Sequence, residues 1–146
     1  MTGEDNEAKK EYLKSYIPKQ KAAKRIEEEI EQLRLDKMFP SITYDDMPHG
    51  SNMSDLSDYM VRLDELISKL IKARYERIDT YSKIFADIEK MEDEKEKELL
   101  TYRYLRGYSW EKVCIVMNYS WKQIHRIHAE ALRKFKMTLN DTQKAC

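Results

Sequence analysis

The sequence predicts an all-α protein, in which a long antiparallel helical hairpin is followed by a compact C-terminal domain of three short helices. The 146-residue chain has only three glycines and three prolines, which is few for a fold rich in sheets and turns. Apolar residues recur at steps of three and four in both arms of the expected hairpin, as they do in amphipathic helices. We expect the hairpin over residues 1–92, the compact domain over 93–137 and a tail over 138–146.

The second arm of the hairpin is predicted over residues 54–91, with Ser54 as its N-cap. No Gly or Pro occurs between Ser51 and Arg106, so no breaker interrupts a helix there. Four extra residues near Arg74 form a stutter in the apolar seam, which locally relaxes a left-handed supercoil. The seam consists of Leu56, Met60, Leu63, Ile67 and Leu70, and then Ile78, Tyr81, Phe85 and Ile88.

The first arm is predicted over residues 4–38, and residues 39–53 form the connecting loop. Pro18 lies inside the first arm, so either the helix bends there or a new helix starts with Pro18 in its first turn. The apolar face of this arm consists of Tyr12, Leu13, Tyr16, Ile17, Ala23, Ile26, Ile30 and Leu33.

The hairpin has more apolar residues than two helices can bury against each other. Further apolar residues lie beside the main seam of the second arm, and they widen the stripe that needs a partner. We therefore expect a homodimer or a higher homo-oligomer. The alternative is that these residues cover the C-terminal domain of the same chain. They are Tyr59, Leu66, Ile71, Tyr75 and Ile84.

The C-terminal domain has the sequence pattern of a helix-turn-helix. A first helix over about 94–106 ends at Gly107, and Ser109 caps a short second helix. Asn118 is suited to a left-handed residue at the end of the second helix, and Ser120 with Gln123 forms a capping box that starts the third. A short turn between a short helix and a longer one is typical of a helix-turn-helix.

The third helix, over about 121–135, has an apolar face and an opposite basic face. Residues 97–146 carry ten Lys and Arg against four Asp and Glu, which favours a polyanionic partner. We expect Ile124, Ile127, Ala131 and Phe135 to be buried, with His128 and Leu132 at the edge. The alternative is an ordinary solvated basic face. The candidate DNA-binding residues are Ser109, Ser120, Trp121, Lys122, Gln123, His125, Arg126 and Arg133.

Within this basic face, Arg can read guanine and Gln can read adenine through two hydrogen bonds, whereas Arg133 and Lys134 are better placed for phosphate. Trp110 and Trp121 follow the two capping serines, and we expect them to pack across the helix junction rather than to contact DNA. The acidic residues between Glu92 and Glu98 alternate with lysines, as expected for a solvated helix junction.

Other function classes are not indicated by the sequence. Cys114 and Cys146 cannot build a disulfide framework, and His125 with His128 lacks an acidic or Cys ligand for zinc. Without a glycine-rich phosphate loop or a nucleophile elbow, we expect no enzyme activity and no cofactor. The polar N-terminus and the absence of an apolar run of about 18 residues favour a cytoplasmic protein with no membrane partner.

The segment YSWEKVCIVMNYSWKQIHRIHAEALRKF resembles region 4 of sigma-70-type factors, which ends in a basic recognition helix. It is still more similar to small phage proteins of the RinA/ArpU type, through the L-x-x-R-Y-x-x-G-Y-S-W pattern from Leu100 to Trp110. The D-x-P-H-G-S stretch from Asp46 to Ser51 extends the resemblance over most of the chain. Asn118, Trp121 and His125 depart from the usual choices, so no base preference can be transferred.

The resemblance implies a DNA-binding regulator of late genes in phages and prophages, with double-stranded DNA and host RNA polymerase as candidate partners. It places Ser120, Trp121, Lys122, Gln123, His125 and Arg126 on the DNA-contacting helix. In these 146 residues, which the hairpin and the three helices already occupy, we expect no promoter-melting domain like that of a complete sigma factor. The alternatives are a small terminase-like DNA-packaging protein and a helical scaffold that binds no DNA.

Overall fold

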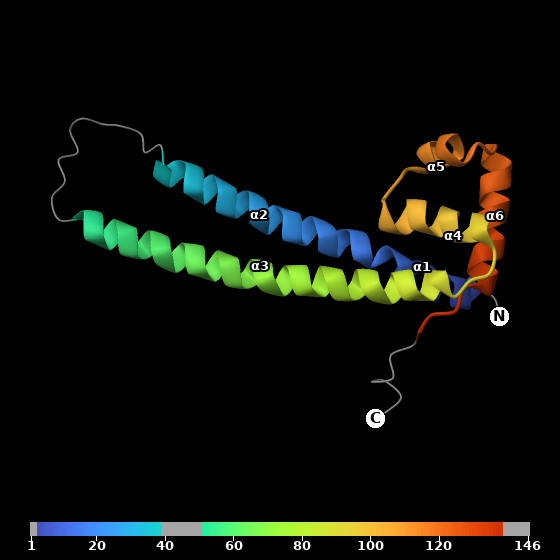
Figure 1. Ribbon diagram of the computed structural model, residues 1–146, viewed down its shortest axis with the longest axis horizontal. Coiled ribbons are helices and arrows are strands. Elements are labelled where there is room, and N and C mark those ends of the chain that lie inside the picture. The colour runs from blue at the N-terminus through green and yellow to red at the C-terminus, as the bar shows by residue number, and fades with distance from the viewer. Residues whose placement is uncertain (1–2, 39–50, 139–146) are drawn as a thin grey trace, which may run out of the picture. The chain divides into compact units, whose positions relative to one another are not determined.

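The computed structural model describes residues 3–38 and 51–138, with side chains placed for 5–36 and 55–138. Every regular element in these segments is a helix, so the all-α prediction is confirmed (Figure 1). No described helix combines the length and the apolar character needed to cross a membrane. Most of the predicted 39–53 loop lies outside the described residues. In chain order the elements are α1 (Gly3–Lys14), α2 (Tyr16–Met38), α3 (Ser51–Glu89), α4 (Glu94–Leu100), the π-helix η1 (Thr101–Leu105), α5 (Trp110–Met117) and α6 (Trp121–Lys134).

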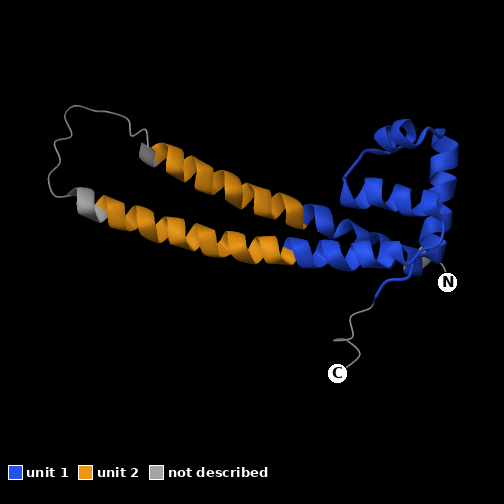
Figure 2. Ribbon diagram, in the orientation of Figure 1, with its two compact units in different colours: residues 1–18, 77–146 blue, residues 19–76 orange. Residues whose placement is uncertain are grey.

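The chain forms two compact units, which Figure 2 distinguishes by colour. Unit 1 comprises residues 1–18 and 77–146, and unit 2 comprises residues 19–76. The helices α2 and α3 each contribute to both units. The boundary between residues 92 and 93 that the sequence suggests does not coincide with this division, because α1 and the end of α3 belong to the same unit as the C-terminal helices. As a statement about independently folding domains, that boundary stays a prediction.

Unit 2 consists of two helical segments that run antiparallel. The Arg74 guanidinium on α3 donates to the Glu27 carboxylate on α2 at 2.9 Å. Nearer the other end, Leu33 and Asp36 of α2 line a shallow groove together with Asp58 of α3. Residue 74 of α3 thus lies near residue 27 of α2, whereas residue 58 of α3 lies near residues 33–36 of α2, so the two segments run in opposite directions.

The break before Pro18 takes the second of the two forms that the sequence allowed. The helix α1 ends at Lys14, the Ser15 hydroxyl donates to the Tyr12 carbonyl at 2.6 Å, and α2 begins at Tyr16. Pro18 thus lies in the first turn of α2, where its missing N–H leaves no hydrogen bond unmade.

Two predictions for α3 are wrong in detail. The helix begins at Ser51, so Ser54 lies inside it and is not its N-cap. In the part that belongs to unit 1, Ile84 and Ile88 are buried, whereas the predicted seam residues Ile78 and Phe85 are exposed. The buried side of this segment also includes Thr80 and Asp87, which are polar, so an apolar pattern alone could not locate it.

Asp87 explains how a polar residue can occupy that buried side. Its carboxylate accepts hydrogen bonds from the Tyr12 hydroxyl at 2.6 Å, from the Thr138 backbone N–H at 3.0 Å and from the Thr138 hydroxyl. A buried carboxylate is tolerated when its oxygens are satisfied in this way. Burial and the neighbouring carboxylate raise the pKa of Tyr12, which keeps its hydroxyl a donor.

The apolar core of unit 1 joins α1 and the end of α3 to the C-terminal helices. The helix α6 packs against α4, α5 and α1, and the Lys9 ammonium of α1 donates to the Leu132 carbonyl near the C-terminus of α6 at 2.8 Å. A cation at that end also complements the helix dipole. The fully buried side chains of this core are Leu13, Ile84, Ile88, Leu99, Leu100, Val113, Ile124, Ala131 and Phe135.

The first helix of the C-terminal segment ends at Gly107, as the sequence predicts. α4 continues into η1, and the Tyr108 N–H donates to the Tyr102 carbonyl at 3.0 Å around Gly107, whose φ is +73°. A Cβ at this position would lie 3.2 Å from Cδ1 of Ile17. Both the backbone conformation and the close approach therefore favour glycine.

Gly107→Ala is expected to lower the free energy of unfolding by about 1–2 kcal/mol, because an L-residue with a Cβ is strained in the left-handed region. Asn118→Gly is the matched control, since Asn118 has a φ of 60° and glycine adopts that conformation freely. Urea denaturation of both variants measures the difference. Equal stability of Gly107→Ala and the parent chain would contradict the strained position.

Candidate nucleic-acid interface

The short helix α5 is held at both ends by the residues that the sequence indicated. The Ser109 hydroxyl caps its start by accepting from the Lys112 backbone N–H at 3.2 Å, and Glu111 lies in the positive first turn. Its end is Asn118, with φ 60° and ψ 48°, and the Tyr119 N–H donates back to the Cys114 carbonyl at 3.1 Å. The left-handed Asn118 redirects the chain, so α5 and α6 are separate helices.

The helix α6 starts with a complete capping box. The Gln123 backbone N–H donates to the Ser120 hydroxyl at 3.2 Å, and the Ser120 backbone N–H donates to Oε1 of Gln123 at 3.0 Å. Both bonds satisfy backbone donors that a helix start leaves open. The Gln123 carbonyl oxygen is thereby engaged, so in this conformation the side chain is not free for the two-bond contact to adenine.

The buried face of α6 differs slightly from the predicted one. Ile124, Ala131 and Phe135 are buried as expected. His128 and Leu132, predicted at the edge, are buried, whereas Ile127, predicted as a core residue, is only half-buried. The reason is that His128 has a specific partner in the core, which the wheel of a single helix cannot reveal.

The opposite face of α6 is exposed and basic. Lys122, Arg126, Ala129 and Arg133 are all exposed. Lys122 and Arg126 make no ion pair with any residue of the described segments, so their charges are free for a ligand. Arg133 differs, because its guanidinium contacts the Glu130 carboxylate through two bonds of 3.2 and 2.8 Å, which raise the pKa of Arg133.

A cluster of aromatic and cationic groups connects α5 and α6 at their N-terminal ends. The Arg103 guanidinium lies 4.5 Å from the ring centroid of Trp110, and the Trp110 and His125 rings are 4.7 Å apart. His125 also contacts the ring of Trp121 at 4.6 Å. Trp110 therefore packs across the junction as predicted. Trp121 packs only partly and leaves 53% of its surface exposed at the start of α6.

His128 is anchored by Tyr104 of η1. The Tyr104 hydroxyl and Nε2 of His128 are 2.7 Å apart. The ring centroids of Trp110 and His128 are 4.7 Å apart, in an edge-to-face arrangement. Burial, reinforced by the positive charge of Lys10, lowers the pKa of His128 to about 4. Burial also raises the pKa of Tyr104 to about 12. Both rings are therefore neutral near pH 7 and form an internal polar contact rather than a ligand site.

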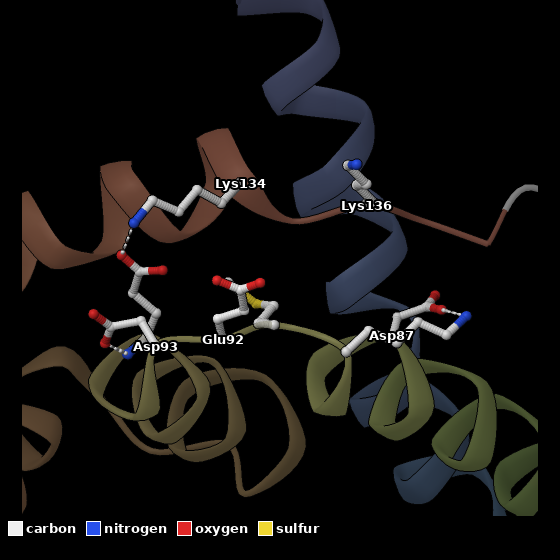
Figure 3. A pocket seen from close by; sticks show the side chains of 8 residues that line it. Asp87, Glu92, Asp93, Lys134 and Lys136 are labelled. Atoms are coloured by element: carbon white, nitrogen blue, oxygen red, sulfur yellow. Dashed lines mark hydrogen bonds and ion pairs between the residues drawn. The ribbon is translucent and has the colours of Figure 1, made fainter.

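The acidic segment after α3 is more structured than a solvated junction. Asp93 caps α4 by accepting from the backbone N–H groups of Lys95 and Glu96, at 2.9 and 3.1 Å. Glu96 is buried, and its carboxylate accepts a hydrogen bond from the Lys134 ammonium at 3.2 Å. Asp93, Glu96 and Lys134 line a cavity of about 580 Å³, and Glu92 and Lys136 line it as well (Figure 3). Lys134, which the sequence suggested as a phosphate ligand, is thus paired with Glu96 at the C-terminal end of α6.

Among the eight predicted DNA-binding residues, Lys122, Arg126 and Arg133 lie on the exposed basic face of α6, and Trp121 is 53% exposed at the start of this helix. Ser109, Ser120 and Gln123 make helix-capping hydrogen bonds, and His125 is half-buried beside the rings of Trp110 and Trp121. Sequence reasoning missed Lys112, an exposed residue in the first turn of α5 whose ammonium lies 4.0 Å from the Tyr108 ring centroid. Its position in the first turn after the cap Ser109 could have indicated a phosphate contact, because the positive start of a helix attracts anions.

The neutral, buried His128 is expected to make folding stability depend on pH. Its pKa in the folded chain, about 4, is below the ordinary value of 6.5, so between these values the unfolded chain binds a proton that the folded chain excludes. The free energy of unfolding therefore falls as the pH falls through this window, by up to about 1.4 kcal/mol per pH unit. Urea denaturation at pH 7 and pH 5 measures the effect. His128→Gln keeps a partner for Tyr104 but does not titrate, and an undiminished pH dependence in that variant would contradict this assignment.

No protein-family model, curated protein or solved structure matches this chain.

Proposed function

We propose that this protein binds double-stranded DNA through a helix-turn-helix formed by α5 and α6, with α6 as the recognition helix in the major groove. The observation that carries the proposal is the contrast between the two sides of α6. Ile124 and Ala131 anchor one side in the core, while Lys122 and Arg126 project from the other without ion-pair partners in the described segments. A rigid, one-sided helix with free cations at its N-terminal end suits base-edge contact.

The residues divide by the kind of DNA contact that their positions favour. Arg126 can donate two hydrogen bonds to guanine, and Lys122, one turn earlier, can reach a base edge or a phosphate. The exposed ring of Trp121 supports an apolar contact at the groove. Lys112, in the first turn of α5, is suited to a backbone phosphate because the helix start also attracts anions. Arg133, shared with Glu130, is a weaker phosphate contact.

The biological role follows from the sequence resemblance and is part of the proposal. The protein would regulate late genes of a phage or prophage, with host RNA polymerase as a second partner. A homodimer would place two recognition helices on one DNA molecule. Two other functions make different predictions: a terminase-like packaging protein would assemble as a ring on viral packaging sites, and a helical scaffold would bind no DNA.

Replacing both Lys122 and Arg126 by Ala is expected to weaken DNA binding at least tenfold, or about 1.4 kcal/mol, because both cations face the groove. Each lost phosphate contact would also reduce the log–log salt slope by about 0.9. Fluorescence anisotropy with a labelled duplex measures both effects. Lys21→Ala/Arg25→Ala is the matched control, because it removes two exposed cations with the same spacing from α2. Equal affinity of the two double variants would refute the assigned recognition face.

Selection of bound DNA from a random pool is expected to yield a site of two half-sites, with centres about 34 Å or a multiple apart. If each protomer neutralises about four phosphates, the log–log slope of affinity against salt is near −7 for the dimer. Ring-sized complexes without spaced half-sites would favour the packaging function. A failure to retard any duplex at low salt would exclude both DNA-binding functions.

A further inference from the structure

Unit 2 buries little apolar surface for its size. Among its described side chains, Ala23 and Ile30 are the only apolar ones that are buried. Along its α3 segment, Leu63, Leu66 and Leu70 are half-buried. Helices of this length depend on the burial of an apolar face more than on helix propensity. The apolar residues that remain exposed therefore identify where a further partner would pack.

Four exposed apolar residues of α3 form a stripe along unit 2, in two pairs on either side of the exposed Asp64. Leu56 and Met60 are 50% and 51% exposed, and Ile71 and Tyr75 are 65% and 69% exposed. At about 100° per residue, the four lie within about 100° of one another around the helix axis. This sector, called the α3 stripe below, is distinct from the half-buried side formed by Leu63, Leu66 and Leu70.

The α3 stripe has an internal symmetry that a second copy can match. Leu56 and Met60 are four residues apart, and so are Ile71 and Tyr75. Both pairs are equally distant from the midpoint between Glu65 and Leu66. A twofold axis at this midpoint, perpendicular to the helix, would place Leu56 opposite Tyr75 of a second copy and Met60 opposite Ile71. This is the self-complementary geometry of an isologous dimer.

The charges along the same segment favour the antiparallel orientation. Residues 55–65 carry four acidic side chains and one basic one, whereas residues 66–76 carry three basic and one acidic. In an antiparallel pair each acidic half lies along the basic half of the other copy, while a parallel pair would align like charges. Packed helices are separated by about 8–10 Å, comparable to the screening length of about 8 Å at physiological salt, so the difference in attraction persists.

We infer that the α3 stripe is a homodimer interface, in which the α3 segments of two copies pack antiparallel about an axis between Glu65 and Leu66. Asp64 lies on the same side near this axis and is exposed in the single chain. The apolar contacts therefore concentrate in two clusters, one on each side of the axis. The interface does not involve α6, so it stands independently of the proposed DNA binding.

Sedimentation of the full chain is the first test, and it should give the mass of a dimer at micromolar concentration. Ile71→Asp introduces a carboxylate into both apolar clusters of the dimer and is expected to raise its dissociation constant at least tenfold. Because Ile71 is exposed in the single chain, the circular dichroism spectrum of the variant should match that of the parent chain. Val61→Asp is the matched control, because Val61 is 54% exposed but lies about 90° from the centre of the stripe. A monomeric parent chain, or equal dimerisation of Ile71→Asp and the parent, would overturn the inference.

Disulfide trapping tests the orientation. Met60→Cys and Ile71→Cys are made in separate, differently tagged chains in which Cys114 and Cys146 are replaced by Ser. The antiparallel dimer brings residue 60 of one copy opposite residue 71 of the other, within the Cα separation of about 7 Å that a disulfide requires. Oxidation of a mixture should then give the mixed dimer in preference to either homodimer. Preferential homodimers would indicate parallel packing, and no cross-link would indicate another partner for the stripe. Either result overturns the inference.

The two proposals can fail separately. Ile71→Asp should remain able to bind a duplex that contains one half-site, because the basic face of α6 is unchanged. Lys122→Ala/Arg126→Ala should still sediment as a dimer. A dimer that binds no DNA would remove the proposed DNA binding alone. A monomer that binds DNA would remove the interface and the expected pair of half-sites, but not DNA binding through α6.

Discussion

The burial of one side of α6 is the constraint on which the rest of unit 1 depends. Ile124, Ala131 and Phe135 occupy the centre of a core to which α1, α3, α4 and α5 all contribute. Because these side chains fix the rotation of α6 about its own axis, Lys122 and Arg126 are left on the solvent side. The basic face is therefore a consequence of core packing. A different rotation would expose apolar surface and bury charge, and both changes cost free energy.

Polar contacts make this packing specific. Asp87 links α3 to Tyr12 and to the segment after α6, while Glu96 holds Lys134. The Tyr104–His128 pair fills the space between η1 and α6. Each contact joins elements that are distant in the sequence, so each favours one arrangement of helices among several that an apolar core alone would allow. The tilted rings of Trp110 and His125, with centroids 4.7 Å apart, add a further contact near the start of α6.

The two units solve the problem of apolar burial differently. Unit 1 encloses a core of large side chains from several helices, whereas unit 2 pairs two helical segments and leaves large apolar side chains in water. Such a distribution suits a division between a unit that presents a binding helix and a unit that associates with another copy. Mutations in the two units should therefore have separable effects, because α6 lies in unit 1 and the α3 stripe lies in unit 2.

The sequence alone determined the helical class, the left-handed Asn118, the capping residues Ser109 and Ser120 and the separation of α5 from α6, because these features depend on interactions within a few residues. It also located the free cations of α6, since a helix with one apolar side has a defined opposite side. The tertiary structure decided what long-range contacts control: that His128 rather than Ile127 is buried, that Ile84 replaces Phe85 in the core, and that Lys134 is held by Glu96. A one-helix pattern cannot contain those outcomes, because the partner that buries or neutralises each side chain comes from another part of the chain.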